Sequence, residues 1–223
     1  MATTAPGGAP SNPWLSTRPE PLDVDLLDLA RTRPARAADH EYEPPTTSGP
    51  LTPQPRLVQA PTPATLPRRV MTQHCTWWWV GAHGGAGEST LATAVAGTAA
   101  SEHAWPQPCP DIGGTHPVLL VARTHASGLL AAQRALTEWA AGGAGAIELL
   151  GLVLLADAPG RAPAPLRDLA RHVAGGAPRT WSLPWVEAWR LGGAQPDLRA
   201  SAGTPTPAAL RRLQSQVTRL LGS

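Results

Sequence analysis

The sequence contains no lysine and no phenylalanine, and its 18 basic residues are all arginine. Charged residues make up only 15% of the chain and the formal net charge is +2, so no strong basic field indicates a nucleic-acid partner. No apolar run reaches the roughly 18 residues of a membrane span, and the first residues lack the features of a secretory signal. Two cysteines, Cys75 and Cys109, are too few for a disulfide framework. These absences predict a cytoplasmic protein without a membrane span.

Proline is abundant, and its distribution divides the chain. Residues 1–70 hold more than half of the 26 prolines. Such a segment cannot bury enough apolar surface to offset the entropy lost on ordering, so we predict a disordered tail over 1–70 and one domain over 71–223. Within the tail, residues 18–36 combine leucines with aspartates. This pattern indicates either a short amphipathic helix that forms on a protein partner or a solvated acidic patch.

After residue 70, apolar runs typical of strands alternate with segments of helical periodicity. Strands are predicted at 74–82, 103–106, 116–124, 147–159 and 179–185, and helices at 89–102, 126–143, 164–176, 186–192 and 206–222. This alternation predicts an α/β fold with three layers and a mainly parallel sheet. Three consecutive tryptophans, Trp77 to Trp79, are expected to be buried on both faces of that sheet.

The sequence HGGAGEST, residues 83–90, connects the first predicted strand of the domain to its first helix. In a phosphate-binding loop, glycines let backbone N–H groups point at phosphate oxygens, a lysine bridges the terminal phosphates, and Ser or Thr holds magnesium. Ser89 and Thr90 stand where those hydroxyl groups belong. Ligands of parallel sheets bind at the carboxyl ends of the strands, which is where this loop is expected. Alternatively, the glycines serve only close packing of strand and helix.

These residues resemble the loop of the MinD/ParA family of P-loop ATPases, whose pattern is lysine, two glycines, a small residue, glycine, lysine and Ser or Thr. His83 takes the place of the signature lysine, and Glu88 takes the place of the phosphate-binding lysine. The candidate nucleotide-binding loop is His83, Gly84, Gly85, Ala86, Gly87, Glu88, Ser89 and Thr90. Residues 118–136 and 181–196 are similar to later segments of that family. The resemblance implies a P-loop NTPase-like fold and ATP or ADP with Mg²⁺ as cofactor, with the metal on Ser89.

Two departures from the family pattern affect the expected activity. A glutamate at position 88 repels phosphate where a lysine attracts it, a change of roughly 4 kcal/mol per unit-charge pair at about 4 Å and an effective dielectric of about 20. The acid of the family's Walker B segment has only Asp111 and Asp157 as candidates. By strand order, Asp157 stands nearer to the family's base-recognition position, where an asparagine is expected. No catalytic residue is therefore assigned.

The sequence thus predicts a degenerate MinD/ParA-like P-loop protein with weak or no ATP hydrolysis. As the resemblance suggests, it would act as a regulatory or adaptor component of partitioning, plasmid or secretion machinery. Two alternatives stay open: an active ATPase with an atypical loop, and a nucleotide-independent module that binds a protein or DNA. DNA is not the favoured partner, although the closing helix carries Arg211, Arg212 and Arg219. A homodimer is compatible with the resemblance.

Overall fold

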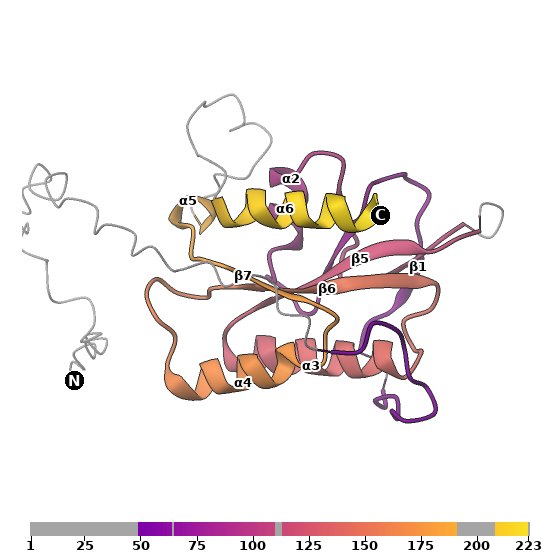
Figure 1. The fold of residues 1–223 in the computed structure, drawn as a ribbon, viewed down its shortest axis with the longest axis horizontal. Helices are drawn as coiled ribbons and strands as arrows, with labels where there is room; N and C mark the ends of the chain where they lie inside the picture. Colours follow the sequence, from indigo (N-terminus) through magenta and orange to yellow (C-terminus); the bar gives the residue numbers. More distant parts are fainter. Residues whose placement is uncertain (1–48, 64, 110–112, 191–207, 223) are drawn as a thin grey trace, which may run out of the picture. The chain divides into compact units, whose positions relative to one another are not determined.

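A five-stranded parallel sheet forms the centre of the domain, in the order β3-β2-β5-β6-β7 (Figure 1). The computed structural model describes residues 49–63, 65–109, 113–190 and 208–222. The strands of this sheet are β2 (Trp78–Gly81), β3 (Ala99–Ala100), β5 (His116–Arg123), β6 (Ile147–Leu155) and β7 (Thr180–Leu183). The prediction of an α/β fold with a mainly parallel sheet is confirmed.

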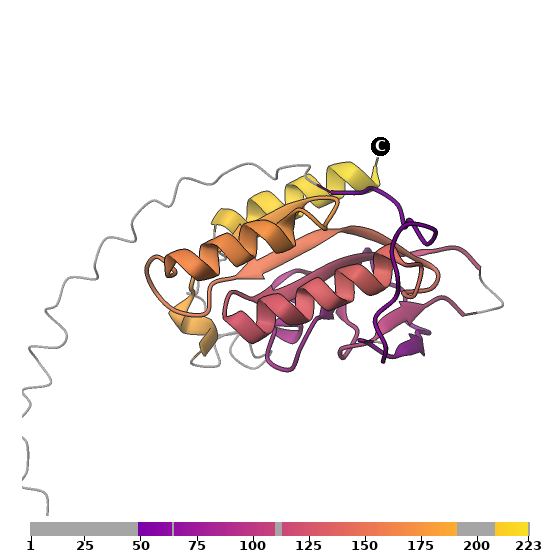
Figure 2. The same ribbon diagram turned by 90° about the horizontal axis from the view of Figure 1, so that it is seen from below.

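Helices cover both faces of the sheet and give three layers (Figures 1 and 2). They are α2 (Glu88–Ala94), α3 (Ala126–Ala140), α4 (Ala164–Ala174), α5 (Glu187–Arg190) and α6 (Ala208–Leu221). Buried residues of α3 and α4 pack on one face, and those of α2 and α6 pack on the other. Within the described ranges, no helix has both the length and the apolar character needed to cross a membrane.

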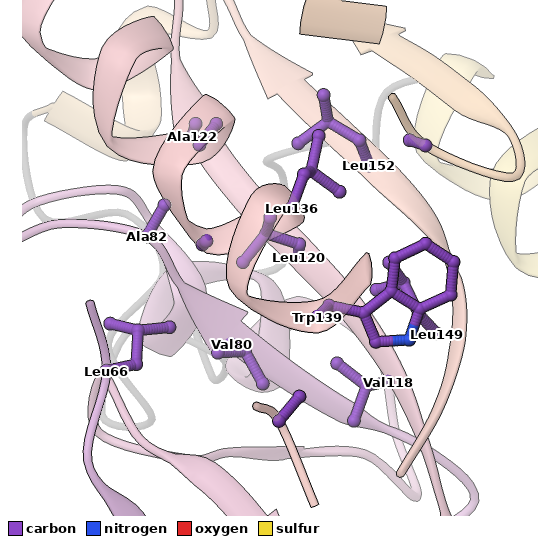
Figure 3. Packing of buried hydrophobic residues seen from close by; sticks show 14 of the residues in the cluster. Leu66, Val80, Ala82, Val118, Leu120, Ala122, Leu136, Trp139, Leu149 and Leu152 are labelled. Atoms are coloured by element: carbon purple, nitrogen blue, oxygen red, sulfur yellow. The ribbon is translucent and has the colours of Figure 1, made fainter. Parts of the chain in front are cut away.

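The three consecutive tryptophans lie in the core on both sides of the sheet, as predicted. Trp78 belongs to the cluster beneath α3, whereas Trp77 and Trp79 belong to the cluster beneath α2 and α6. All three are 2% exposed or less. Figure 3 shows the cluster beneath α3, where Leu136 and Trp139 of that helix reach down to the strands.

The helix predicted over 89–102 is shorter in the structure, and strand β3 lies in the second half of the predicted range. Helix α2 ends at Ala94, and Gly97 turns the chain with a φ of 78°. Thr98 holds this turn, because its Oγ1 donates to Val95 O at 2.8 Å and accepts from Trp79 Nε1 at 2.8 Å. Pairing with the edge of β2 therefore outweighs the helix propensity of the alanines.

The packed domain begins before residue 70, the boundary that the sequence predicts. Strand β1 (Arg68–Val70) pairs in parallel with β4 (Trp105–Gln107), and Leu66 is buried in the core. Upstream, Gln54 N donates to Ala140 O at the end of α3, and Figure 2 shows the segment running past that end of the helix. Residues 1–48 of the predicted tail, with the candidate partner segment 18–36, lie outside the described residues.

Glu138 of α3 fastens this N-terminal segment to the domain. Its side chain is 3% exposed, and Oε2 accepts hydrogen bonds from the backbone N–H groups of Thr65 at 2.9 Å and Leu66 at 3.1 Å. Two backbone donors of the segment, a buried one on Leu66 and a partly buried one on Thr65, thus depend on one carboxylate, and loss of that acceptor leaves both without this partner.

We therefore expect Glu138→Ala to lower the free energy of unfolding by about 2–4 kcal/mol, since one buried and one partly buried N–H group lose their acceptor. Denaturant titration of the full chain measures this change. Amide hydrogen exchange at Thr65 and Leu66 should accelerate. Glu148→Ala, at an exposed position of β6, is the matched control and should change stability by less than about 0.5 kcal/mol. Equal effects of the two substitutions would show that Glu138 does not hold the segment.

Candidate functional site

The glycine-rich loop lies at the carboxyl end of β2, as the sequence predicts, and leads directly into α2. Gly85 and Gly87 adopt φ values of 77° and 103°, a left-handed conformation that side chains rarely tolerate. A Cβ atom on Gly87 would also come within 2.9 Å of Leu155 Cδ2. By contrast, a Cβ atom on Gly84 would meet nothing within 4 Å. Gly87 is thus favoured by its conformation, and a side chain there would have to displace Leu155, while the crest of the loop is open.

Glu88, the first residue of α2, points into the protein and away from the crest of the loop. The side chain is 4% exposed. Its Oε2 accepts a hydrogen bond from Gly81 N at 2.5 Å, and its Oε1 accepts one from His103 N at 3.1 Å. Oε1 also lies 3.0 Å from His103 Nδ1. The sequence led us to expect that this carboxylate faces the phosphate site. In the structure, Glu88 instead joins the end of β2 to the turn that follows β3.

The turn that contacts Glu88 has an unusual backbone. Glu102 and His103 have φ values of 55° and 56°, which are uncommon for residues other than glycine. The bonds from His103 to Glu88 help to hold this conformation, and Arg69 pairs with Glu102 at 2.5 Å from the other side. Gly81 completes the arrangement, since a Cβ atom there would lie 2.5 Å from His103 Nδ1 and 3.0 Å from Glu88 Oε2.

The other predicted site residues differ in exposure and in their distance from this loop. Ser89 is exposed and Thr90 is half-buried in the first turn of α2, whereas Ala86 is buried. Asp111 lies outside the described residues. Asp157 follows β6 and reaches the same edge of the sheet, two strands away from the loop. In the described part of the chain, the only strand between α2 and β4 is β3, and it leads to Ser101 and Glu102 without an aspartate.

His83 contacts the neighbouring strand end instead of offering a charge to the loop. Its Nε2 accepts a hydrogen bond from Arg123 N at 3.1 Å, and its Nδ1 lies 2.9 Å from Gly84 O, so Nδ1 carries the proton. Its ring meets the ring of His125 edge-on at 5.0 Å. Burial is the main cause that lowers the pKa of His83 below its ordinary value, with further lowering by His125, His103 and Arg123. His83 is therefore neutral at pH 7.

A pocket of about 220 Å³ opens beside the loop, at the carboxyl ends of four strands. Its charged lining residues are Arg123, Asp157 and Arg190. The remaining lining residues are Gly85, His125, Leu155, Ala156, Pro184, Trp185, Val186 and Trp189. Arg123 is fixed by a 3.1 Å hydrogen bond from Nη1 to Ala156 O. The pocket thus combines aromatic surface with both signs of charge.

The sequence model of a protein family matches residues 75–204, which is more than half of the chain. This family is DUF6668, a family of unknown function. The chain belongs to this family. The loop and every residue that lines the pocket lie within the match, whereas α6 and the segment 49–70 lie outside it. No curated protein and no solved structure matches the chain.

Several residues of this DUF6668 site are absent from the sequence-based predictions. His103 contacts Glu88 only because the turn after β3 folds back, and no motif signals that contact. Arg123 and His125 lie at the carboxyl end of a strongly predicted strand, so the rule that ligands bind there could have identified them. No motif in the sequence marks Trp185 or Trp189 as site residues. The structure places both at the pocket.

The position of Glu88 predicts how substitutions there behave. Glu88→Lys would bury an ammonium group against two N–H donors, so we expect it to lower the free energy of unfolding by at least about 3 kcal/mol. Glu88→Gln keeps one acceptor oxygen and should cost about 1–2 kcal/mol. Chemical denaturation measures both, with Glu148→Lys at an exposed position of β6 as the control. A Glu88→Lys protein as stable as wild type that binds ATP more tightly would restore the interpretation of Glu88 as a phosphate-facing charge.

The protonation state of His83 can be tested separately. Its pKa is lowered in the folded chain, so the unfolded chain takes up this proton first as the pH falls below about 6.5. Acidification through that range should therefore favour unfolding. Imidazole NMR titration should give a midpoint for His83 below 6.5. A midpoint above 7 would instead make His83 a cation at the position that corresponds to the signature lysine of the MinD/ParA pattern.

Proposed function

We propose that this DUF6668 protein is a MinD/ParA-like nucleotide-binding module that hydrolyses ATP weakly or not at all and acts as a regulatory or adaptor component. The position of Glu88 carries the proposal. The side chain that stands in place of the phosphate-binding lysine is buried and bonded within the protein, so the loop keeps its shape without presenting a cation. His83 is neutral and supplies no substitute charge.

The residues present fit part of a nucleotide. A pocket of about 220 Å³ is smaller than the about 300–1,000 Å³ of typical ligand sites, so it suits a base with its sugar, and the rest of the ligand would extend over the open loop. Trp185 and Trp189 offer aromatic surface for the base, and Arg190 is an exposed cation at the rim for a phosphate group. ATP or ADP is the nucleotide that the resemblance implies.

A hydrolytic magnesium site does not fit the residues that the structure describes. Across the described ranges, no group of three or more His, Cys, Asp or Glu side chains is placed to hold a metal ion. Ser89 offers a single hydroxyl group, and the turn that follows β3 brings His103 and Glu102, not an aspartate, to the loop. This supports binding without turnover, in which the nucleotide would select a conformation for a partner protein.

A second candidate function is a nucleotide-independent module that binds a partner. One observation favours it: the contacts of Glu88 with Gly81 and His103 hold the loop without any ligand. In that case the glycine-rich sequence serves the packing of β2, α2 and the turn after β3. The two candidates differ in whether the pocket binds a nucleotide at all.

Calorimetry on the full chain with ATP and ADP, with and without Mg²⁺, tests the proposal. We expect binding, with turnover below about 0.01 s⁻¹, a hundredth of the lower end of ordinary enzymes. Arg190→Ala should weaken binding at least about tenfold, or about 1.4 kcal/mol. Arg171→Ala, on the exposed side of α4, should not. Absence of binding by either nucleotide would favour the nucleotide-independent module, and a turnover near 1 s⁻¹ would overturn the proposal in favour of an active ATPase.

A further inference from the structure

Arg123, the last residue of β5, brings a positive charge to the pocket at a fixed position. Its side chain is half-buried, and its Nη1 donates to Ala156 O at 3.1 Å, which holds the guanidinium group at the edge of the sheet. Within the described ranges, this group forms no ion pair. A guanidinium group that is held in place and has no carboxylate partner is well suited to bind an anion.

His125 adds a hydrogen-bond donor close to Arg123 in the lining of the same pocket. Gly128 N donates to His125 Nδ1 at 2.9 Å, so the neutral imidazole carries its proton on Nε2. Ser127 Oγ also lies 3.0 Å from Nδ1. In the described part of the chain, Nε2 has no hydrogen-bond partner. Local bonding therefore sets the position of this proton and leaves the Nε2–H group for a ligand.

We infer that Arg123 and His125 form a phosphate subsite that takes the metal-free form of the nucleotide; this rests on the proposed nucleotide-binding function. Arg123 supplies a positive charge with a planar set of donors, and His125 supplies one further donor. Gly85 lines the pocket beside them, and a Cβ atom there would meet nothing within 4 Å, so further phosphate groups have room over the loop. Protein side chains thus supply the positive charge that a metal ion otherwise brings to a phosphate group.

The charges in the pocket disfavour a nucleotide that carries magnesium. Mg²⁺ prefers six oxygen ligands and is usually held by one or two carboxylates together with phosphate oxygens. Among the described residues that line the pocket, Asp157 is the only carboxylate, and it shares the lining with Arg123 and Arg190. A bound Mg²⁺ would cancel two of the negative charges that attract the arginines, and the arginines would repel the ion itself. Metal-free ADP or ATP therefore matches the pocket better than its magnesium complex.

Asp157 distinguishes metal-free binding from magnesium binding. Its side chain is exposed at the pocket, so its charge acts on any ligand there. In metal-free binding, the carboxylate repels the phosphate groups, and Asp157→Asn should tighten the binding of ADP. In magnesium binding, the same carboxylate is the metal ligand that the pocket offers, and Asp157→Asn would weaken the binding of the magnesium complex.

Calorimetry on the full chain with ADP, in EDTA and in excess MgCl₂, tests the inference. We expect wild type to bind ADP in EDTA at least about threefold more tightly than in MgCl₂. Arg123→Gln should weaken metal-free binding at least about tenfold, and Arg123→Lys, which keeps the charge, should recover part of the loss. His125→Ala should weaken it about threefold to tenfold, as expected for one hydrogen bond. Arg171→Gln and His172→Gln, at exposed positions of α4, are the matched controls and should bind as wild type does.

Tighter binding of ADP with Mg²⁺ than without it would overturn the inference and leave the proposed function standing. The inference is also overturned if Asp157→Asn weakens binding in MgCl₂, or if Arg123→Gln and His125→Ala bind metal-free ADP as wild type does. Thermal unfolding shows whether each variant is folded, and the comparison of EDTA with MgCl₂ needs no variant.

Inorganic pyrophosphate and adenosine, titrated separately in EDTA, distinguish failure of the proposed function from failure of the inference. If pyrophosphate binds through Arg123 as tightly as ADP and adenosine does not bind, the phosphate subsite stands and the nucleotide function fails. If adenosine binds as tightly as ADP and pyrophosphate does not bind, the pocket holds the nucleoside alone and the phosphate subsite is wrong. If none of the three ligands binds, both fail.

Discussion

The buried carboxylate of Glu88 is the contact on which this edge of the sheet depends. It accepts N–H groups from the last residue of β2 and from the turn after β3, so one side chain determines the spacing between two neighbouring strand ends. That turn has two consecutive residues in a left-handed conformation, which are costly without compensating bonds. Gly81 is confined to glycine by the same contact, since a side chain there would occupy the space of His103 and Glu88. The shape of the loop therefore follows from internal bonding and does not need a bound anion.

This arrangement separates two properties that a phosphate-binding loop normally combines. The backbone conformation is set by Gly85, Gly87 and the contacts of Glu88, whereas the cations lie elsewhere, on Arg123 and Arg190 at the ends of β5 and α5. A ligand at this edge would meet its positive charge in the pocket and not in the loop. Charge and aromatic surface then come from β5, β6, β7 and α5, and the loop contributes mainly an open surface.

The sequence predicted the sheet well because long apolar runs such as 116–124 and 147–159 allow few alternatives, and the consecutive tryptophans could only be buried on both faces. It failed where tertiary contacts outweigh local preference, as at Ala99 and Ala100, which pair with β2 although alanine favours helices. The loop was located correctly, but the direction of Glu88 was not, because its partner His103 is fifteen residues away in a turn without a motif. The proline-rich segment before residue 70 was misleading for a similar reason: composition does not reveal that Glu138 bonds two of its N–H groups.

The closing helix α6 has a consequence for what counts as the folding unit. Leu210, Leu213 and Val217 are fully buried against the face of the sheet that carries Trp181, and the indole N–H of Trp181 donates to Gln216 Oε1 at 2.7 Å. Helix α6 lies beyond the family match, as does the segment that Glu138 holds. A fragment cut to the matched boundaries would expose large apolar areas on both sides of the sheet and would tend to self-associate. Expression and evolutionary comparison of such domains therefore need the flanking segments, which supply part of the core from outside the recognisable sequence.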